Sequence, residues 1–262
     1  MYNYEEACPI SQAASVLCER WTLQIVREML LGASRFSELQ SYLPKMSPTL
    51  LNSRLKTLER QGIILRTKIR EKKGYEYRLT PTGLDLKPVL HEMGKWGMQW
   101  VFARMNPSQL NLAAIVRDYA VWIQTDQLPA GHTTIQISVT GESSPIKKFI
   151  LVRDGRTQVC EENIGNEVDI YLTASLETLG KIWFGELELN TAREQGLLKV
   201  VGSTFCVNNL GKWLRTSQFA DYNQINNSPC SATSTPGQPS RNKPINAVME
   251  AQPVIPLVPD PK

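Results

Sequence analysis

An amphipathic pattern over residues 47–62 is the clearest in the chain. Three leucines recur at helical spacing and form one apolar stripe: Leu51, Leu55 and Leu58. Ser47 can accept an N-cap hydrogen bond, and Pro48 fits the first helical turn, where no amide donor is needed. Gly62 can adopt the left-handed conformation that ends a helix. The pattern therefore predicts a helix with a marked beginning and end.

The opposite face of this predicted helix is polar and cationic. It carries Thr49, Asn52, Ser53, Lys56 and Arg60. Hydroxyl, amide and cationic side chains can meet base edges and phosphates in the major groove of DNA. Many amphipathic helices instead turn a solvated polar face to water and bind nothing. The segment that follows the helix favours the DNA-binding interpretation over the solvated one.

Residues 63–70 and 75–79 read as two strands joined by a turn at residues 71–74. Arg70, Lys72 and Lys73 flank this turn. Between positions 35 and 78 there are eleven Lys or Arg against four Asp or Glu, a local charge of +7 that suits phosphate neutralisation. A helix followed directly by a basic hairpin indicates a winged DNA-binding unit.

Several linked motifs over residues 5–105 resemble the HxlR-type winged helix-turn-helix regulators, relatives of the MarR group. The motifs are residues 8–10, 20–28, 35–39, 47–62 and 75–83. The resemblance implies helices at 10–18, 22–31 and 35–43 before the recognition helix. Helical spacing of Phe36, Leu39 and Leu43, and of Leu23, Val26 and Leu30, agrees with it.

Further candidate DNA contacts lie before the recognition helix and at its start. Arg35 and Ser37 begin the preceding helix, where they either contact the phosphate backbone or are merely solvated. Ser47, at the start of the recognition helix, is a further candidate contact.

A helix is predicted from Thr80 and Pro81 onward, with one apolar side. That side carries Leu86, Val89, Leu90, Met93, Trp96, Gly97, Trp100 and Val101. These side chains could pack in the chain's own core, but the resemblance implies contact with the same helix of a second subunit. We expect a homodimer with Met93, Trp96 and Trp100 in the interface, because two-fold related recognition helices read half-sites about 34 Å apart.

Length and charge limit the number of domains, the location and the binding partners of the protein. A length of 262 residues allows two domains with real cores, and no apolar run is long enough to span a membrane. With no signal peptide in the sequence, a cytoplasmic location is expected. The net charge differs between the two parts: it is +6 over residues 1–105 and −3 over residues 106–227. We therefore expect no polyanion to bind the second part and no membrane partner.

Cysteine and histidine use argues against metals and disulfide frameworks. The five cysteines show no CxxC spacing, and there are two histidines, so no metal and no cofactor are expected. Cys8 precedes proline, as does the cysteine through which some HxlR-type proteins sense thiol-reactive compounds. It is either such a sensor or a small buried side chain beside the dimer helices.

The pattern after residue 108 predicts an α+β domain. A helix is expected over residues 110–127, and strands over 135–139, 149–153, 157–160, 168–172 and 197–202. Asp154 and Gly155 indicate a two-residue hairpin turn. Ser175 can cap a helix that continues to residue 184, and short helices are expected at 191–195 and 209–214.

Residues 108–216 resemble the sterol-carrier-protein-like fold, with 169–173, 176–184 and 196–202 as the best-matching segments. The resemblance implies a sheet with helices across one face and an apolar cavity for a small hydrophobic ligand. The same apolar residues could equally form a filled core. From position 226 to 262 the composition predicts a disordered tail.

The expected function is therefore sequence-specific binding of double-stranded DNA by a dimeric transcriptional regulator whose second domain reports a hydrophobic metabolite. One alternative is a carrier or enzyme that acts through the C-terminal domain, with the winged helix as a tether. Another keeps DNA binding but makes the second domain a structural dimer module. No Ser/His/Asp set, carboxylate pair or phosphate loop is recognisable, so we expect no enzyme.

Overall fold

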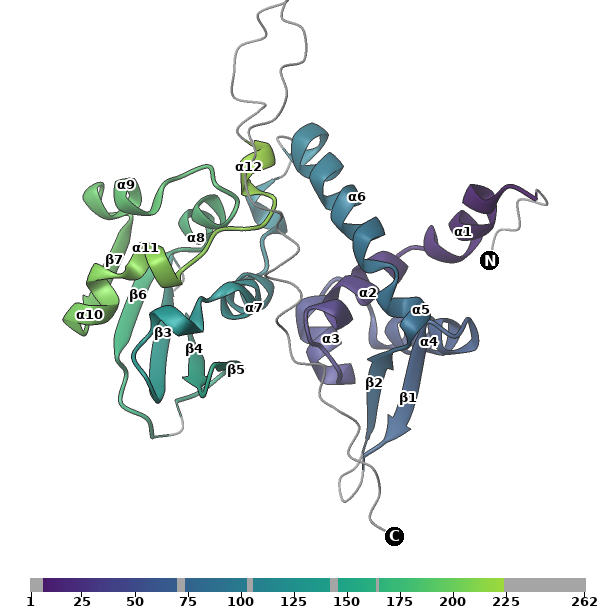
Figure 1. The fold of residues 1–262 in the computed structure, drawn as a ribbon, viewed down its shortest axis with the longest axis horizontal. Helices are drawn as coiled ribbons and strands as arrows, with labels where there is room; N and C mark the ends of the chain where they lie inside the picture. The colour runs from purple at the N-terminus through teal and green to yellow at the C-terminus, as the bar shows by residue number, and fades with distance from the viewer. Residues whose placement is uncertain (1–6, 70–73, 103–105, 142–145, 164, 224–262) are drawn as a thin grey trace, which may run out of the picture. The chain divides into compact units, whose positions relative to one another are not determined.

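The computed structural model describes residues 7–69, 74–102, 106–141, 146–163 and 165–223 (Figure 1). Two hydrophobic cores share no residue, and each belongs to one domain. The first draws on residues 16–90 and the second on residues 110–214. The predicted disordered tail lies outside the described residues. Among those described, no helix is long and apolar enough to cross a membrane.

The N-terminal domain is a winged helix-turn-helix, as predicted. In its described part the elements follow in the order α1 (Pro9–Leu17), α2 (Thr22–Leu30), α3 (Phe36–Tyr42), α4 (Pro48–Arg60), β1 (Ile64–Lys68), β2 (Tyr75–Leu79), α5 (Pro81–Leu84) and α6 (Lys87–Trp100). β1 and β2 pair antiparallel, from Ile64 opposite Leu79 to Lys68 opposite Tyr75. This hairpin is the wing.

The helix expected from Thr80 onward is divided into α5 and α6. α5 is a single turn that packs on the end of the wing. A Cβ atom at Gly83 would lie 2.3 Å from the Ile63 carbonyl oxygen, so this close approach requires glycine. Thr80 caps the turn through a hydrogen bond from the Gly83 amide at 3.2 Å.

The buried face of α2 differs from the predicted one. Leu23 and Leu30 are half-buried, whereas Ile25, Val26 and Met29 form the buried apolar face. Glu28 is also fully buried, at 0% exposure. The helical period was assigned correctly, but the pattern alone could not show that a carboxylate shares the buried side.

The C-terminal domain is α+β, as predicted. Its described elements are α7 (Leu112–Trp122), β3 (His132–Thr140), β4 (Ile146–Arg153), β5 (Arg156–Cys160), β6 (Ile170–Ser175), α8 (Leu176–Trp183), α9 (Leu189–Glu194), β7 (Leu198–Gly202), α10 (Thr204–Asn208), α11 (Leu210–Trp213) and α12 (Ala220–Asn223). Two 3₁₀ turns flank α7, at Pro107–Gln109 and Thr125–Gln127.

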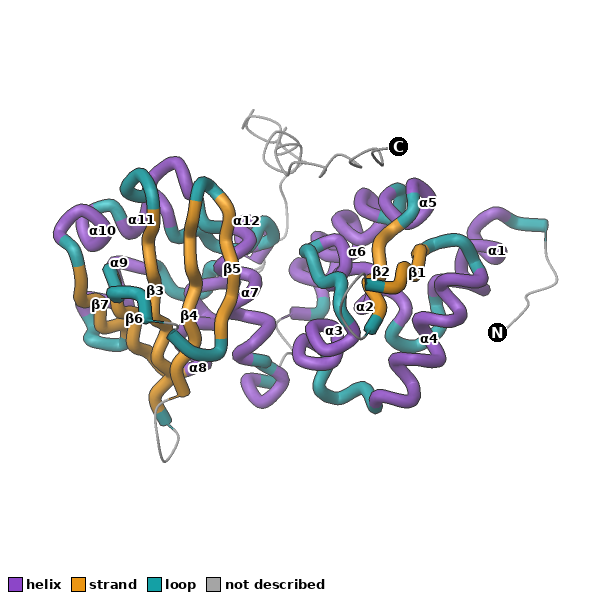
Figure 2. The backbone as a smooth tube through the Cα atoms, turned by 90° about the horizontal axis from the view of Figure 1, so that it is seen from below, coloured by secondary structure: helices purple, strands orange, loops and turns teal. Residues whose placement is uncertain are grey.

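The five strands form one mixed sheet in the order β5-β4-β3-β6-β7 (Figure 2). β3 and β6 pair parallel at its centre, and the other neighbours pair antiparallel. Two features of this domain that the sequence predicts are confirmed. Asp154 and Gly155 both have positive φ, 49° and 72°, in the β4–β5 turn, and Ser175 caps α8 by accepting a hydrogen bond from the Thr178 amide at 3.0 Å.

Several boundaries in this domain differ from those expected. The helix predicted over 110–127 ends at Trp122, and the strand predicted over 168–172 begins at Ile170 and runs directly into α8. α10 and α12 were not predicted. Each is only one turn long, so neither develops a recognisable hydrophobic period.

Candidate nucleic-acid interface

Helix α4 is fixed in the domain by its apolar stripe. Leu51, Leu55 and Leu58 are at most 2% exposed. The Ser47 hydroxyl accepts a hydrogen bond from the Leu50 amide at 3.3 Å, and Gly62 has a left-handed φ of 68°. The expected beginning and end of the helix are therefore confirmed, and its orientation is set by burial of one side.

The other side of α4 is open to solvent. All five polar residues assigned to it from sequence are exposed: Thr49, Asn52, Ser53, Lys56 and Arg60. The Arg60 guanidinium donates to the Thr57 hydroxyl at 3.1 Å, so this side chain lies along the helix. A surface hollow here is lined by Ser53, Lys56, Glu59 and Arg60, and the Glu59 carboxylate offsets part of its positive charge.

Two backbone amides just before α3 are hydrogen-bonded within the chain. The Glu38 carboxylate accepts from the amides of Ser34 and Arg35, at 2.8 and 2.9 Å. A phosphate contact by Arg35 would thus use its side chain rather than its backbone amide. The Ser37 side chain is exposed and Arg35 is half-buried.

The wing is joined to both helices of the helix-turn-helix. The Thr80 hydroxyl, at the end of β2, donates to the Gly62 carbonyl at 2.5 Å, and the Tyr77 amide donates to the Ser34 carbonyl at 2.8 Å. The Arg66 guanidinium lies 3.5 Å from the centre of the Tyr75 ring, an arrangement that holds a cation on the wing surface. Arg70, Lys72 and Lys73, the predicted phosphate contacts of the wing, lie outside the described residues.

Arg54 was not singled out from sequence, yet it links α4 to the turn before α2. Its guanidinium lies 2.7 Å from the Glu19 carboxylate and donates to the Arg20 carbonyl at 3.1 Å. Trp21 in this turn has a φ of 77°, an uncommon conformation for a bulky residue. The partners lie more than thirty positions apart, so helical periodicity could not reveal the contact.

Helix α6 carries an exposed apolar stripe. Met93, Trp96 and Trp100 are 49%, 62% and 60% exposed, and Val89 and Val101 extend the stripe. The intervals of three and four residues place these side chains on one side of the helix. Contiguous exposed apolar surface of this kind is typical of a protein–protein contact.

Cys8 is exposed at the beginning of α1. Backbone amides of Ser11 and Ile10, followed by the Ser11 side chain, lower the pKa of its thiol by hydrogen bonding to the thiolate. The sequence predicts that this helix begins at residue 10, so it does not indicate that Cys8 lies at a helix terminus. The structure places Cys8 in surroundings that favour the reactive form.

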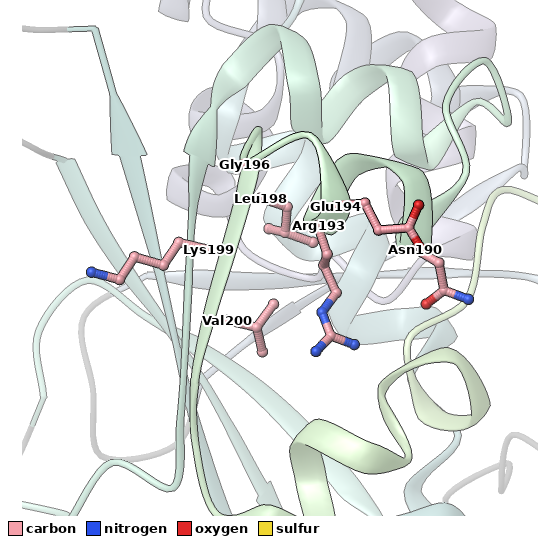
Figure 3. Close-up of a pocket in the computed structure, with 7 residues that line it drawn as sticks. All are labelled: Asn190, Arg193, Glu194, Gly196, Leu198, Lys199 and Val200. Carbon is pink, nitrogen blue, oxygen red and sulfur yellow. The ribbon is translucent and has the colours of Figure 1, made fainter.

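One hollow on the α+β domain is polar and open to solvent. It lies between α9 and β7 and is lined by Asn190, Arg193, Glu194, Gly196, Leu198, Lys199 and Val200 (Figure 3). The Lys199 side chain extends away from Arg193, so the two cations do not converge on one ligand. This hollow does not have the chemistry of the apolar cavity that was expected.

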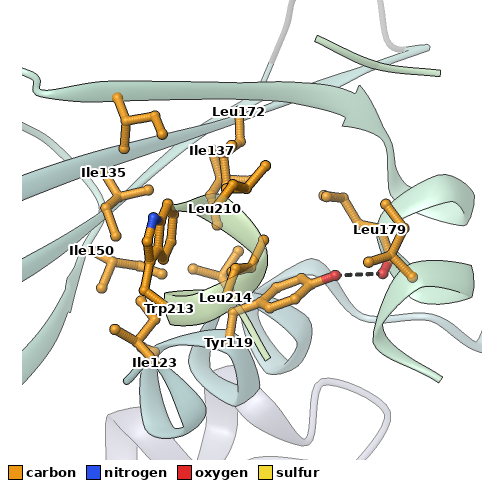
Figure 4. Packing of buried hydrophobic residues seen from close by; sticks show 14 of the residues in the cluster. Tyr119, Ile123, Ile135, Ile137, Ile150, Leu172, Leu179, Leu210, Trp213 and Leu214 are labelled. Atoms are coloured by element: carbon orange, nitrogen blue, oxygen red, sulfur yellow. Dashed lines mark hydrogen bonds between the residues drawn. The ribbon is translucent and has the colours of Figure 1, made fainter. Parts of the chain in front are cut away.

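The interior of the same domain is built from branched and aromatic side chains (Figure 4). Ile135, Ile137 and Ile150 on the sheet pack against Trp213 and Tyr119 from the helices. Both aromatic residues have polar partners, since the tyrosine hydroxyl donates to the Leu179 carbonyl and the indole NH donates to the Cys206 carbonyl, each at 2.9 Å. Burial raises the pKa of the Tyr119 phenol, so it stays neutral at physiological pH.

The described residues include no group of three or more His, Cys, Asp or Glu that could hold a metal ion. The N-terminal domain presents hydrogen-bonding and cationic side chains on the exposed face of α4, next to the cationic β1–β2 hairpin. This arrangement suits a nucleic-acid duplex. By its fold and surface the domain is a winged helix-turn-helix of the nucleic-acid-binding class.

Comparison with known proteins agrees. Residues 16–105 match the HxlR-like helix-turn-helix family, and residues 121–215 match the SCP-2 sterol transfer family. The HTH-type regulator YvaP of Bacillus subtilis is 41% identical over 101 residues, which cover 38% of this chain and 94% of YvaP. The HTH-type regulator sll1512 of Synechocystis is 37% identical over 95 residues, covering 36% of this chain and 70% of sll1512.

A solved structure from Porphyromonas gingivalis, described as a regulator of the MarR family, is 29% identical. The match covers 38% of this chain and 100% of that one, with a TM-score of 0.35. On the sequence matches, this chain belongs to the HxlR-like helix-turn-helix family and also carries a domain of the SCP-2 sterol transfer family.

Proposed function

We propose that this chain is a transcriptional regulator that binds operator DNA as a homodimer, with residues 1–105 as its DNA-binding and dimerisation domain. The observation that carries the proposal is the exposed polar face of α4, from Thr49 to Arg60, opposite a fully buried leucine stripe. Membership of the HxlR-like family supports it, since relatives such as YvaP are named as transcriptional regulators. Such a protein acts in the cytoplasm, where operator DNA lies.

Different side chains have different tasks in this proposal. Thr49, Asn52 and Ser53 read base edges in the major groove, because hydroxyl and amide groups can distinguish bases there. Phosphate contacts fall to Arg35, Ser37, Ser47, Lys56 and Arg60. Arg70, Lys72 and Lys73 of the wing bind phosphate or the minor groove without choosing a sequence, so their replacement lowers specific and non-specific affinity alike.

The stripe on α6 supplies the two-fold interface. Each buried aromatic side chain contributes on the order of 2 kcal/mol, so replacing Trp96 and Trp100 by alanine should convert most dimer to monomer at micromolar concentration. Tight operator binding should be lost with it, because one half-site loses its partner. Sedimentation of the double variant tests this. A stable dimer that still binds operator would place the interface elsewhere.

Residues 108–216 sense a small hydrophobic ligand in this proposal. The match to the SCP-2 sterol transfer family supports it, as does an interior made of branched and aromatic side chains. A ligand that binds one dimer geometry better than another would change the spacing of the two α4 helices and hence operator affinity. Titration with a fatty acid or a terpenoid, followed by operator affinity, tests this step.

Cys8 is the candidate sensor of thiol-reactive compounds, because it is exposed at the beginning of α1 and the pKa of its thiol is lowered. If Cys8→Ser leaves the response of DNA binding to electrophiles unchanged, the thiol has a structural role.

The match to the sterol transfer family also favours a second function, that of a hydrophobic-ligand carrier with the winged helix as a tether. A carrier would transfer a labelled sterol or fatty acid between vesicles with no dependence on DNA, and an enzyme would turn a substrate over. In a third possible function, the protein binds DNA and the α+β domain serves only as a structural dimer module. No hydrophobic ligand would then alter DNA binding.

Selection of duplexes from a random library with the full chain tests the main proposal. Anisotropy with the selected duplex and a scrambled one, at several salt concentrations, should show preference for the selected duplex. Affinity should fall with salt by a logarithmic slope of about 0.9 per phosphate contact. Unchanged binding by a folded Asn52, Ser53 and Lys56 triple-alanine variant would remove α4 from the interface.

A further inference from the structure

The first turn of α7 is bonded to the last turn of α3, the helix that precedes the recognition helix. The Asn111 side-chain oxygen caps α7 by accepting from the amides of Ala113 and Ala114, at 2.9 and 3.3 Å. The nitrogen of the same amide donates to the carbonyls of Tyr42 and Ser41, at 3.3 and 3.4 Å. One side chain therefore both starts a helix of the α+β domain and satisfies the end of a helix in the winged domain.

Two turns further along, α7 supplies a positive charge to the winged domain. The Arg117 guanidinium forms ion pairs with the Glu28 carboxylate of α2 and with Asp118 beside it. Glu28 is fully buried, and the Arg117 side chain is 5% exposed. The guanidinium also lies 4.6 Å from the centre of the Tyr42 ring. Arg27 completes the cluster by donating from Nε to Glu28 at 2.9 Å.

Burial makes this contact more than an incidental surface pair. A carboxylate removed from water is unfavourable unless a charge and hydrogen bonds compensate it. Part of that compensation for Glu28 comes from Arg117 in the other domain, about ninety positions later in the chain. The inner geometry of α2 and α3 therefore depends on where α7 lies.

The opposite face of α7 belongs to the interior of the α+β domain. Arg117 and Tyr119 are two positions apart, so they point about 200° apart around the helix. The Tyr119 hydroxyl donates to the Leu179 carbonyl, and Ile115 and Val116 are buried in the same core. A change in that core thus acts on the helix that holds Glu28 and the end of α3.

We propose that Asn111 and Arg117 are positioning residues of the helix-turn-helix, through which the α+β domain sets how well α3 and α4 fit operator DNA. This inference rests on the proposed DNA-binding function. It assigns α7 as the element that connects the two domains, and it requires no contact between the α+β domain and DNA.

Three variants of the full chain test it. Asn111→Asp keeps the oxygen that caps α7 but removes the donor and brings a negative charge against two carbonyls. Arg117→Met removes the ion pair with little change in side-chain length. Glu28→Gln combined with Arg117→Met removes both charges of this pair, so the fully buried Glu28 carboxylate is no longer left without Arg117; Asp118 keeps its charge at 20% side-chain exposure. Lys181→Met is the matched control, because it breaks the exposed Lys181–Glu177 pair on α8 of the same domain.

The readouts are affinity for the selected duplex, affinity for a scrambled duplex, melting temperature, and hydrogen exchange of the α2 and α3 amides. We expect Asn111→Asp and Arg117→Met to weaken selected binding at least tenfold and scrambled binding less than twofold, with faster exchange in α2 and α3. The double variant should recover most of the melting temperature lost in Arg117→Met while selected binding stays weak. Lys181→Met should match the unmodified chain in every readout.

Other results would overturn the inference. One is unchanged preference for the selected duplex in a folded Asn111→Asp or double variant. Another is an equal loss for both duplexes that follows the melting temperature, which would make the contact purely structural. If the unmodified chain itself shows no preference for its selected duplex, the proposed DNA-binding function fails instead.

Discussion

The Arg54 guanidinium lies 2.7 Å from the Glu19 carboxylate, and this pair joins the recognition helix to the turn before α2. Both side chains are largely shielded, at 21% and 17% exposure, and Arg54 also donates to the Arg20 carbonyl. The turn contains Trp21 in a left-handed conformation, which surrounding contacts must maintain. Arg54 therefore holds α4 from its side rather than from its DNA-facing surface.

Arg54→Met should weaken operator binding about tenfold and lower stability by about 1 to 2 kcal/mol, since a charge-assisted hydrogen bond and a partly shielded ion pair are lost. The slope of affinity against salt should stay unchanged, because no phosphate contact disappears. Anisotropy over a salt series measures both quantities. A reduced slope would mean instead that Arg54 contacts phosphate directly.

Lys56→Ala provides the contrasting case on the exposed face of the same helix. We expect weaker binding to every duplex and a logarithmic salt slope lower by about one unit, with thermal stability unchanged.

Asn52→Ala, on the same exposed face, should instead reduce the preference between selected and altered duplexes by about 1 to 3 kcal/mol at one base position. If Asn52→Ala leaves that preference intact, α4 does not read bases through this residue.

Gly94 and Gly97 on α6 form a matched pair for stability measurements. The Phe219 ring lies over Gly94, so that a Cβ atom there would be 2.3 Å from the ring, whereas a Cβ atom at Gly97 would meet nothing within 4 Å. Gly94→Ala should lower the melting temperature because the ring must move. Gly97→Ala should raise the free energy of unfolding by up to about 1 kcal/mol through helix propensity.

Chemical denaturation of the two glycine variants makes this comparison. Equal stabilisation by both substitutions would show that Phe219 does not pack on α6 in solution. Added to a Phe219→Ala background, Gly94→Ala should give the gain expected from helix propensity relative to Phe219→Ala alone, because the obstacle is then absent.

The thiols of Cys8 and Cys160 should differ in the pH at which they react. Backbone amides lower the pKa of Cys8, whereas burial raises the pKa of Cys160. Since the thiolate is the nucleophile, iodoacetamide should label Cys8 at lower pH than Cys160 as the pH is raised through neutrality. Mass spectrometry of digested protein follows each site, and the reverse order would contradict the surroundings described for these cysteines.

Local chemistry explains which parts of the fold could be predicted. Ser47, Pro48 and Gly62 mark the ends of α4, and Asp154 with Gly155 marks the β4–β5 turn, because each acts on its immediate neighbours in the chain. Polar exposure on α4 followed from the position of its leucines. These elements were assigned correctly since hydrophobic period and capping agreed.

Contacts between distant residues could not be predicted in this way. Burial of Glu28 depends on Arg117, and the role of Arg54 depends on Glu19. A charged residue inside a helical pattern reads as solvated unless its partner is known. One-turn helices such as α10 are equally hidden, because four or five residues do not develop a period.

The parallel pairing of β3 with β6 has a consequence for the order in which the protein forms during synthesis. The first core draws on residues up to Leu90, so the winged domain can close while later residues are still being translated. β3 can pair with β4 once Arg153 has emerged, but its other edge stays unpaired until Ile170–Ser175 follows. Because the burial of Glu28 depends on Arg117 of α7, we expect α2 and α3 to reach their final geometry only after the α+β domain has formed around α7.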